Sequence, residues 1–307
     1  MQEQEEIKTP SFTQPWRIFA IEAFLFCLTL GLGIAAAFRI NKILEVAEVL
    51  PHLPPHPISW GSAIEKIALP QISFWKFLAA FFLATLFIFL IIRFLKFKRG
   101  KGLIFKILFT LAVFLGGLLF LEAFFLEPIP LILISFLIFW WWKSPSILNQ
   151  DLLMVLGMAG VGSTLGLSLK PEMVIVLLII FSIYDYIAVY KTKHMIKMAK
   201  EMIEQKAILA LVVPPNLLGF QESLGEIRPG GKFLILGGGD IVFPLLFSAS
   251  LIPFGILNSI IVALFALIGL FLGFYFFIRQ KVRQPIPALP PIALFSIIGF
   301  LITRILW

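Results

Sequence analysis

The 307-residue sequence is poor in two residue types that often build catalytic and metal sites, with one cysteine, Cys27, and three histidines. A single cysteine excludes an intrachain disulfide and argues against a cysteine-based metal site. The histidines are His52, His56 and His194, and none belongs to an HExxH zinc motif. None lies in a long apolar run either, which argues against a serine–histidine site within a membrane. We therefore expect no metal and no cofactor.

Charged residues are also scarce, at 14% of the chain, whereas 60% of the residues are hydrophobic and the mean hydropathy is +1.01. A soluble domain typically has about 25% charged residues. Several apolar runs reach the roughly 20 residues that cross a hydrocarbon core about 30 Å thick. The net charge of +8 comes from basic residues between these runs, a pattern typical of membrane topology. The sequence therefore predicts a polytopic, all-α protein of the lipid bilayer that does not bind nucleic acid.

Nine transmembrane helices are predicted within a single membrane domain. They cover residues 17–38, 73–94, 103–125, 128–142, 151–169, 171–190, 233–250, 253–278 and 286–306. We divide the chain into a six-helix part (1–190), a loop (191–232) and a three-helix part (233–307). The span at 151–169 is rich in Gly, Ala, Ser and Thr, which favours a packing helix because small residues let helix backbones approach closely.

The distribution of basic residues predicts the orientation of the chain. If the N-terminus is cytoplasmic, 19 of the 25 Lys and Arg residues lie on the cytoplasmic side and six lie outside. The positive-inside rule supports this arrangement. It places the 191–232 loop in the cytoplasm and the C-terminus outside.

Four acidic residues lie well inside the predicted spans. Glu22 and Glu122 are close to the ends of their helices, and we interpret both as boundary carboxylates. Asp185 lies six residues before Lys191, and Asp240 lies eight residues after Lys232. At 1.5 Å per residue, both aspartates are about 9–12 Å below the cytoplasmic surface. They can therefore meet if their helices pack together.

Two carboxyl groups that face each other away from water cannot readily both ionise, so they share one proton near neutral pH. Such a pair can act as general acid and general base in peptide hydrolysis, as in aspartic proteases. A proton- or cation-coupled transporter or channel that uses the same two aspartates as a relay would satisfy the same electrostatics. The two aspartates alone do not distinguish these functions.

Three short motifs accompany the aspartates, namely Tyr184–Asp185, the sequence GGGD at 237–240 and the sequence PALP at 287–290. Their order, on the sixth, seventh and ninth spans, resembles the YD, GxGD and PAL motifs of the presenilin and signal peptide peptidase family of intramembrane aspartyl proteases. The resemblance implies that Asp185 and Asp240 are catalytic. It also implies that seven residues support the site: Tyr184, Gly237, Gly238, Gly239, Pro287, Ala288 and Leu289.

The same resemblance implies a substrate and a branch of the family. The expected substrates are transmembrane helices of other proteins, cut within the membrane. A cytoplasmic 191–232 loop matches the presenilin branch, in a compact prokaryotic-type homologue that does not require accessory subunits. An apolar stretch within this loop, 208–220, has three possible roles by family logic, as a strand that pairs with substrate, a plug or a self-cleavage region.

Glycine and proline in the motifs have physical consequences of their own. Glycine lets a helix loosen and lets another backbone approach. Four prolines within residues 285–291 argue against regular helix there. Irregular backbone at membrane depth is tolerated only where it is buried in protein or lines a water-filled cavity. Hydrolysis requires such a cavity.

Overall fold

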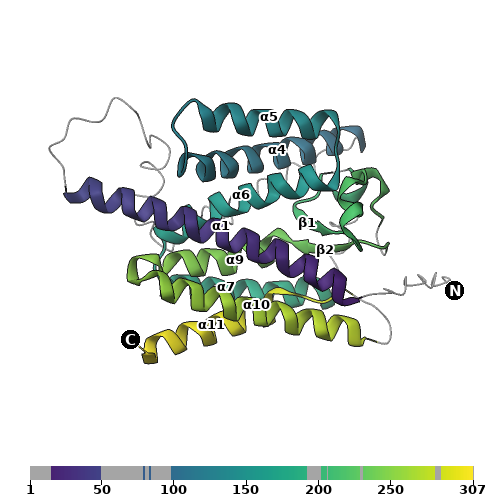
Figure 1. Ribbon diagram of the computed structural model, residues 1–307. Coiled ribbons are helices and arrows are strands. Elements are labelled where there is room, and N and C mark those ends of the chain that lie inside the picture. The colour runs from purple at the N-terminus through teal and green to yellow at the C-terminus, as the bar shows by residue number, and fades with distance from the viewer. Residues whose placement is uncertain are drawn as a thin grey trace.

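The computed structural model describes residues 15–49, 79, 83, 98–191, 202–205, 207–228, 231–280 and 285–306. The described chain is a bundle of apolar helices with one small sheet at the end where α1 begins (Figure 1). Within these residues, five helices are long and apolar enough to cross a membrane, and three shorter apolar helices accompany them.

The long elements follow the order of the predicted spans. The helices are α1 (Pro15–Val49), α4 (Lys98–Glu122), α5 (Ile129–Lys143), α6 (Ile147–Ser168), α7 (Pro171–Tyr186), α9 (Gly238–Ser250), α10 (Ile256–Arg279) and α11 (Leu289–Leu306). Eight of the nine predicted spans thus coincide with described helices. The remaining one, 73–94, lies outside the described residues except for positions 79 and 83.

Short elements connect these helices. They are the π-helical turn η1 (Ile187–Lys191), the 3₁₀ turns η2 (Leu217–Gln221), η3 (Leu224–Glu226) and η4 (Ile252–Phe254), and the strands β1 (Ala210–Val213) and β2 (Leu234–Gly237).

Two predicted boundaries are wrong. The first span ends at Val49 rather than at 38, so α1 is about 52 Å long and extends beyond a hydrocarbon core of about 30 Å. The seventh span is not helical from 233, because Leu234–Gly237 form β2 and the helix begins only at Gly238. Three consecutive glycines disfavour helix, and the preceding apolar residues find a partner strand instead.

The proline-rich segment before the last helix is irregular only in part. Residues 285–287 are not helical, as predicted, but α11 already includes Leu289, Pro290 and Pro291. Proline is tolerated in a first helical turn, where its missing N–H would have no intrahelical partner.

Helix α6 is the packing helix that its small residues predict. The backbone of Gly160 lies against that of Gly116 in α4, so a Cβ at Gly160 would collide with the Gly116 carbonyl oxygen. Near the other end of α6, a Cβ at Gly166 would meet the Leu246 carbonyl oxygen of α9 at 2.7 Å. Helix α6 thus joins the α4–α5 pair to α9.

The 208–220 segment forms half of an antiparallel sheet. β1 pairs with β2 in a register that joins Ala210 to Gly237 and Val213 to Leu234. The hairpin lies beside the first residues of α6 and at the end of the bundle where α1 begins (Figure 1). Because β2 runs directly into α9, the sheet holds the first turn of that helix in place.

Candidate active site

Asp185 lies in the last turn of α7, and its side chain is buried, with 6% of its surface exposed. The α-helix ends one residue later and continues as the π-helical turn η1. π-Helical turns are rare and occur frequently at functional sites. The carboxyl therefore lies where the backbone of α7 changes its geometry.

Asp240 lies in the first turn of α9 and is also buried, with 8% exposed. Gly237 is the N-cap residue, so Asp240 occupies the third helical position, N3. Its side chain accepts a hydrogen bond from the Gly237 backbone N–H. A side chain at N3 that reaches back to the N-cap N–H is half of a capping box, and the helix dipole favours negative charge at this end.

An aromatic contact turns the two aspartate-bearing helix faces toward each other. The rings of Phe181 in α7 and Phe243 in α9 are stacked, with their centroids 4.5 Å apart. Phe181 is four residues before Asp185 and Phe243 is three residues after Asp240, and such spacings lie on one face of a helix. In keeping with this, the charges of Asp185 and Asp240 interact electrostatically.

The third motif joins the same site through its backbone. The Leu289 N–H, at the start of α11, donates a hydrogen bond to the Asp185 carboxyl. Pro287 and Leu289 are buried and Ala288 is half-buried. The three sequence motifs therefore meet at one place, where Asp185 is bonded to a main-chain N–H of the PALP segment and Asp240 to one of its own GGGD segment.

One of the predicted supporting residues, Tyr184, lies differently from what its motif suggests. Tyr184 is 60% exposed on α7, so its side chain faces away from the buried carboxyls. Of Gly238 and Gly239, Gly238 makes the closer approach, because a Cβ there would lie 3.1 Å from the Leu209 carbonyl oxygen. A Cβ at Gly239 would make an ordinary contact, 3.6 Å from the Phe243 ring.

The interpretation of Glu22 as a boundary carboxylate is wrong. Its side chain is 4% exposed, its Oε2 atom is buried without a hydrogen-bond partner, and its charge interacts with that of Asp240. Glu22 is only five residues beyond the start of the predicted span at 17, which suggested that it could reach the interface. The face of α1 on which it lies packs against the protein instead. Glu122 is the last residue of α4, as a boundary carboxylate should be.

Two further polar residues escaped the sequence reasoning. Gln150 and Asp151, in the first turns of α6, are 0% and 2% exposed. Polar residues are ordinary at the start of a predicted span, and the only signal that could have singled these two out is their place immediately before a long apolar run. Within the described ranges, no group of three or more His, Cys, Asp or Glu side chains is placed to hold a metal ion.

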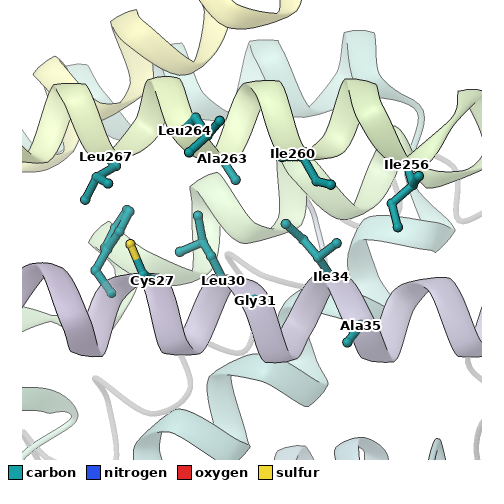
Figure 2. A pocket seen from close by; sticks show the side chains of 11 residues that line it. Cys27, Leu30, Gly31, Ile34, Ala35, Ile256, Ile260, Ala263, Leu264 and Leu267 are labelled. Carbon is teal, nitrogen blue, oxygen red and sulfur yellow. The ribbon is translucent and has the colours of Figure 1, made fainter.

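A separate apolar groove of about 400 Å³ lies between α1 and α10. Figure 2 shows Leu30 and Ile34 of α1 facing Ile260 and Ala263 of α10 across it. None of the acidic residues described above lines this groove, so it is not part of the carboxyl site.

Comparison with known proteins agrees with this arrangement. Residues 55–307 match the family model described as "Signal-peptide peptidase, presenilin aspartyl protease". Two solved structures of a presenilin family intramembrane aspartate protease, in space groups C222 and P2, have the same fold. The first matches with a TM-score of 0.60 and 20% identity over 95% of this chain and 99% of that chain. The second matches with a TM-score of 0.56 and 21% identity over 93% and 96%. No curated protein matches.

Because the family model covers most of the chain, the protein belongs to the signal-peptide peptidase and presenilin aspartyl protease family. It is a multi-pass intramembrane aspartyl protease with a presenilin-like fold, and its family acts on protein substrates.

The ring stack between α7 and α9 gives a first testable prediction. Phe181→Ala or Phe243→Ala removes the contact that faces the two helices toward each other. A misplacement of about 1 Å can cost up to about 100-fold in rate, so we expect kcat for peptide cleavage to fall about 10- to 100-fold in either variant. The matched control is Val176→Ala on the exposed face of α7, which should keep kcat within about twofold. Equal rates in all three variants would contradict this role of the stack.

Proposed function

We propose that Asp185 and Asp240 are the catalytic pair and that they hydrolyse peptide bonds within transmembrane segments of protein substrates. The observation that carries this proposal is their common burial. Two carboxyl groups from neighbouring helices interact away from bulk water, each held by one backbone N–H. Burying charge is costly unless it serves a purpose or is compensated.

The proposed reaction uses the pair as one acid–base unit. The ionised carboxylate takes a proton from a water molecule, whose oxygen forms a bond to the carbonyl carbon of the substrate. The protonated partner donates a hydrogen bond to the carbonyl oxygen. When the C–N bond breaks, a carboxyl proton passes to the leaving nitrogen, which departs as an amine. The Gly237 and Leu289 amides keep the two carboxyl groups oriented throughout.

Conservative substitution of either aspartate tests this proposal. Asp185→Asn and Asp240→Asn keep the size of the side chain but remove its ability to exchange a proton. General acid–base groups contribute about 100- to 10,000-fold to rate, so we expect cleavage of a fluorogenic transmembrane peptide by purified enzyme to fall by at least that much. Glu172→Gln, which alters an exposed carboxylate 3.5 Å from Arg304, is the matched control and should retain full activity.

The same variants address the rival transport function. Proton or cation flux into liposomes that depends on both aspartates, without peptide cleavage, would overturn the catalytic assignment. Cleavage that persists in Asp185→Asn or Asp240→Asn would overturn it as well.

For orientation, we propose a cytoplasmic N-terminus and 191–232 loop and an external C-terminus, with catalysis near the inner leaflet. The basic residues support this, because 19 of 25 then lie on the cytoplasmic side. The same arrangement suits substrates whose N-terminus is outside. The chain would work without accessory subunits.

Single cysteines introduced into a Cys27→Ser background test the orientation. Leu218 is 75% exposed in η2 and Lys170 is exposed at the opposite end of the bundle. In sealed cells, a membrane-impermeant maleimide should label Lys170→Cys and leave Leu218→Cys unlabelled until the membrane is opened. The reverse pattern would invert the proposed topology.

We also propose how the substrate is held beside the carboxyls. The Val212 N–H bonds to a side chain of α6 rather than to β2. In an antiparallel ladder, alternate residues turn both backbone polar groups toward the partner. Val212 and its partner Ile235 are therefore a pair that exchanges no hydrogen bonds between the two strands. The N–H and C=O of Ile235 point instead to the outer edge of β2.

That outer edge suits an extended substrate. In the described residues the sheet has only two strands, so the edge at Ile235 carries no strand. A substrate segment unwound from its helix would add there as a third strand, five residues before Asp240. The outer edge of β1, by contrast, is covered by α6, so the 208–220 segment supports β2 rather than receiving substrate itself.

Proline at position 235 tests substrate addition at this edge. Ile235→Pro removes an outward-pointing N–H without removing a bond between β1 and β2, and proline is tolerated on edge strands in this position. One lost backbone hydrogen bond is worth about 0.5–1.5 kcal/mol, so we expect KM to rise about 3- to 10-fold with thermal stability unchanged. Ile235→Val, which keeps the N–H, should behave as the unsubstituted enzyme does, and an unchanged KM in Ile235→Pro would contradict the proposal.

A further inference from the structure

The cytoplasmic end of α6 carries three consecutive buried polar residues, Asn149, Gln150 and Asp151, none more than 2% exposed. Buried polar groups are nearly always hydrogen-bonded, so each position needs a reason. Asn149 has a local one, because it forms a capping box with Ser146 at the helix N-terminus. The other two reach across to the 208–213 segment.

Asp151 and Gln150 bind the backbone of this segment at two points. The Asp151 Oδ1 atom accepts a hydrogen bond of 2.9 Å from the Val212 N–H. The Gln150 side-chain amide donates to the Ile208 carbonyl, and its oxygen accepts from the Trp141 indole N–H at 2.9 Å. The other Asp151 oxygen, Oδ2, is buried without a partner. A carboxyl group is costly in such a place, and the one described bond it makes is to β1.

The loop that follows β1 is tied to the same end of α6. The Ile147 N–H donates to the Glu222 carbonyl at 3.0 Å, and the Leu224 N–H donates to the Pro145 carbonyl at 3.1 Å. The segment is therefore attached to α6 on both sides of η2. Of these attachments, the bonds of Gln150 and Asp151 are the ones that contact β1 and the residues leading into it.

The position of β1 along α6 determines the position of Asp240, because β1 pairs with the strand that leads to it. β1 sets the register of β2, with Leu211 opposite Leu236 and Ala210 opposite Gly237. The ladder of hydrogen bonds continues into the GGGD motif, because the Gly238 N–H donates to the Leu209 carbonyl at 3.3 Å. Side chains alternate along a strand, so a shift of one residue would turn every side chain to the other face.

We propose that Asp151, assisted by Gln150, is a positioning residue that fixes the register of the β1–β2 hairpin and thereby selects which peptide bond of the substrate is cut. This inference rests on the proposed addition of substrate to the outer edge of β2. A substrate strand aligned on β2 has a defined residue beside Asp240 only while β2 itself is held in one register. Asp151 contacts no substrate in this scheme and acts through Val212.

The pattern of cleavage products distinguishes positioning from general support of the fold. Asp151→Leu removes the acceptor for the Val212 N–H but fills a similar volume, and Asp151→Asn keeps an acceptor oxygen. With a transmembrane peptide and mass spectrometry of the products, we expect the ratio of the main product to products cut two residues away to fall about 2- to 10-fold in Asp151→Leu. Asp151→Asn should restore the original ratio. Hydrogen exchange of a peptide covering 209–214 should become faster in Asp151→Leu alone.

A matched variant separates register from stability. Ile134→Ala creates a cavity where α5 packs on Gly117 of α4, remote from the hairpin. It should lower thermal stability and leave the product ratio unchanged. If Asp151→Leu does not accumulate as folded protein, Gln150→Met, which removes the bond to the Ile208 carbonyl, decides the question by the same ratio.

Two results would overturn the inference. One is an unchanged product ratio in Asp151→Leu or, if that variant does not fold, in Gln150→Met. The other is a shift of the product ratio in Ile134→Ala as large as that in the tested variant. Failure of the proposed catalytic pair gives a different result, because cleavage would then survive Asp185→Asn or Asp240→Asn whatever residue occupies position 151.

Discussion

The site depends on one contact between helices, the packing of α7 on α9 at the stacked rings of Phe181 and Phe243. This contact faces Asp185 and Asp240 toward each other although they belong to separate segments of the chain. A pair of carboxyl groups buried away from water is destabilising, even when the two share one proton, unless hydrogen bonds compensate it. The compensation comes from main-chain N–H groups of Gly237 and Leu289, so the GGGD and PALP segments are needed in these places for the aspartates to be tolerated at all.

The junction between β2 and α9 explains why glycine accumulates before Asp240. A strand ends and a helix begins within three residues, which leaves backbone N–H groups without helical partners. One of them, from Gly237, bonds to Asp240, and another, from Gly238, bonds to Leu209 in the neighbouring segment. Irregular backbone of this kind persists at membrane depth only where protein surrounds it. Here α6 and the paired strands provide that cover.

Three buried acidic side chains lie near one end of the molecule. Buried carboxyl oxygens without hydrogen-bond partners are found there at Glu22, Asp151 and Asp185, and others are found at Glu222 and, at the end of α4, at Glu122. Toward the other end, helices meet through small residues, as at Gly116 and Gly160, although the buried hydroxyls of Ser248 and Ser259 also lack partners there. The buried carboxyl oxygens without partners near the hairpin lower the stability of the fold. Functional sites commonly do so, because groups arranged for chemistry are not arranged for the lowest folding free energy.

The sequence by itself determined that the chain crosses a membrane many times, because length and apolar composition decide this without reference to partners. It also singled out Asp185 and Asp240, since a lone carboxylate in an apolar run has few explanations and the three motifs accompany it. Tertiary structure alone decided the rest. Glu22 and Asp151 are buried, and Tyr184 is exposed, because the burial of a helix face depends on what packs against it. The short run at 234–237 is a strand because residues 210–213 pair with it, and periodicity cannot distinguish a short buried strand from a helix segment.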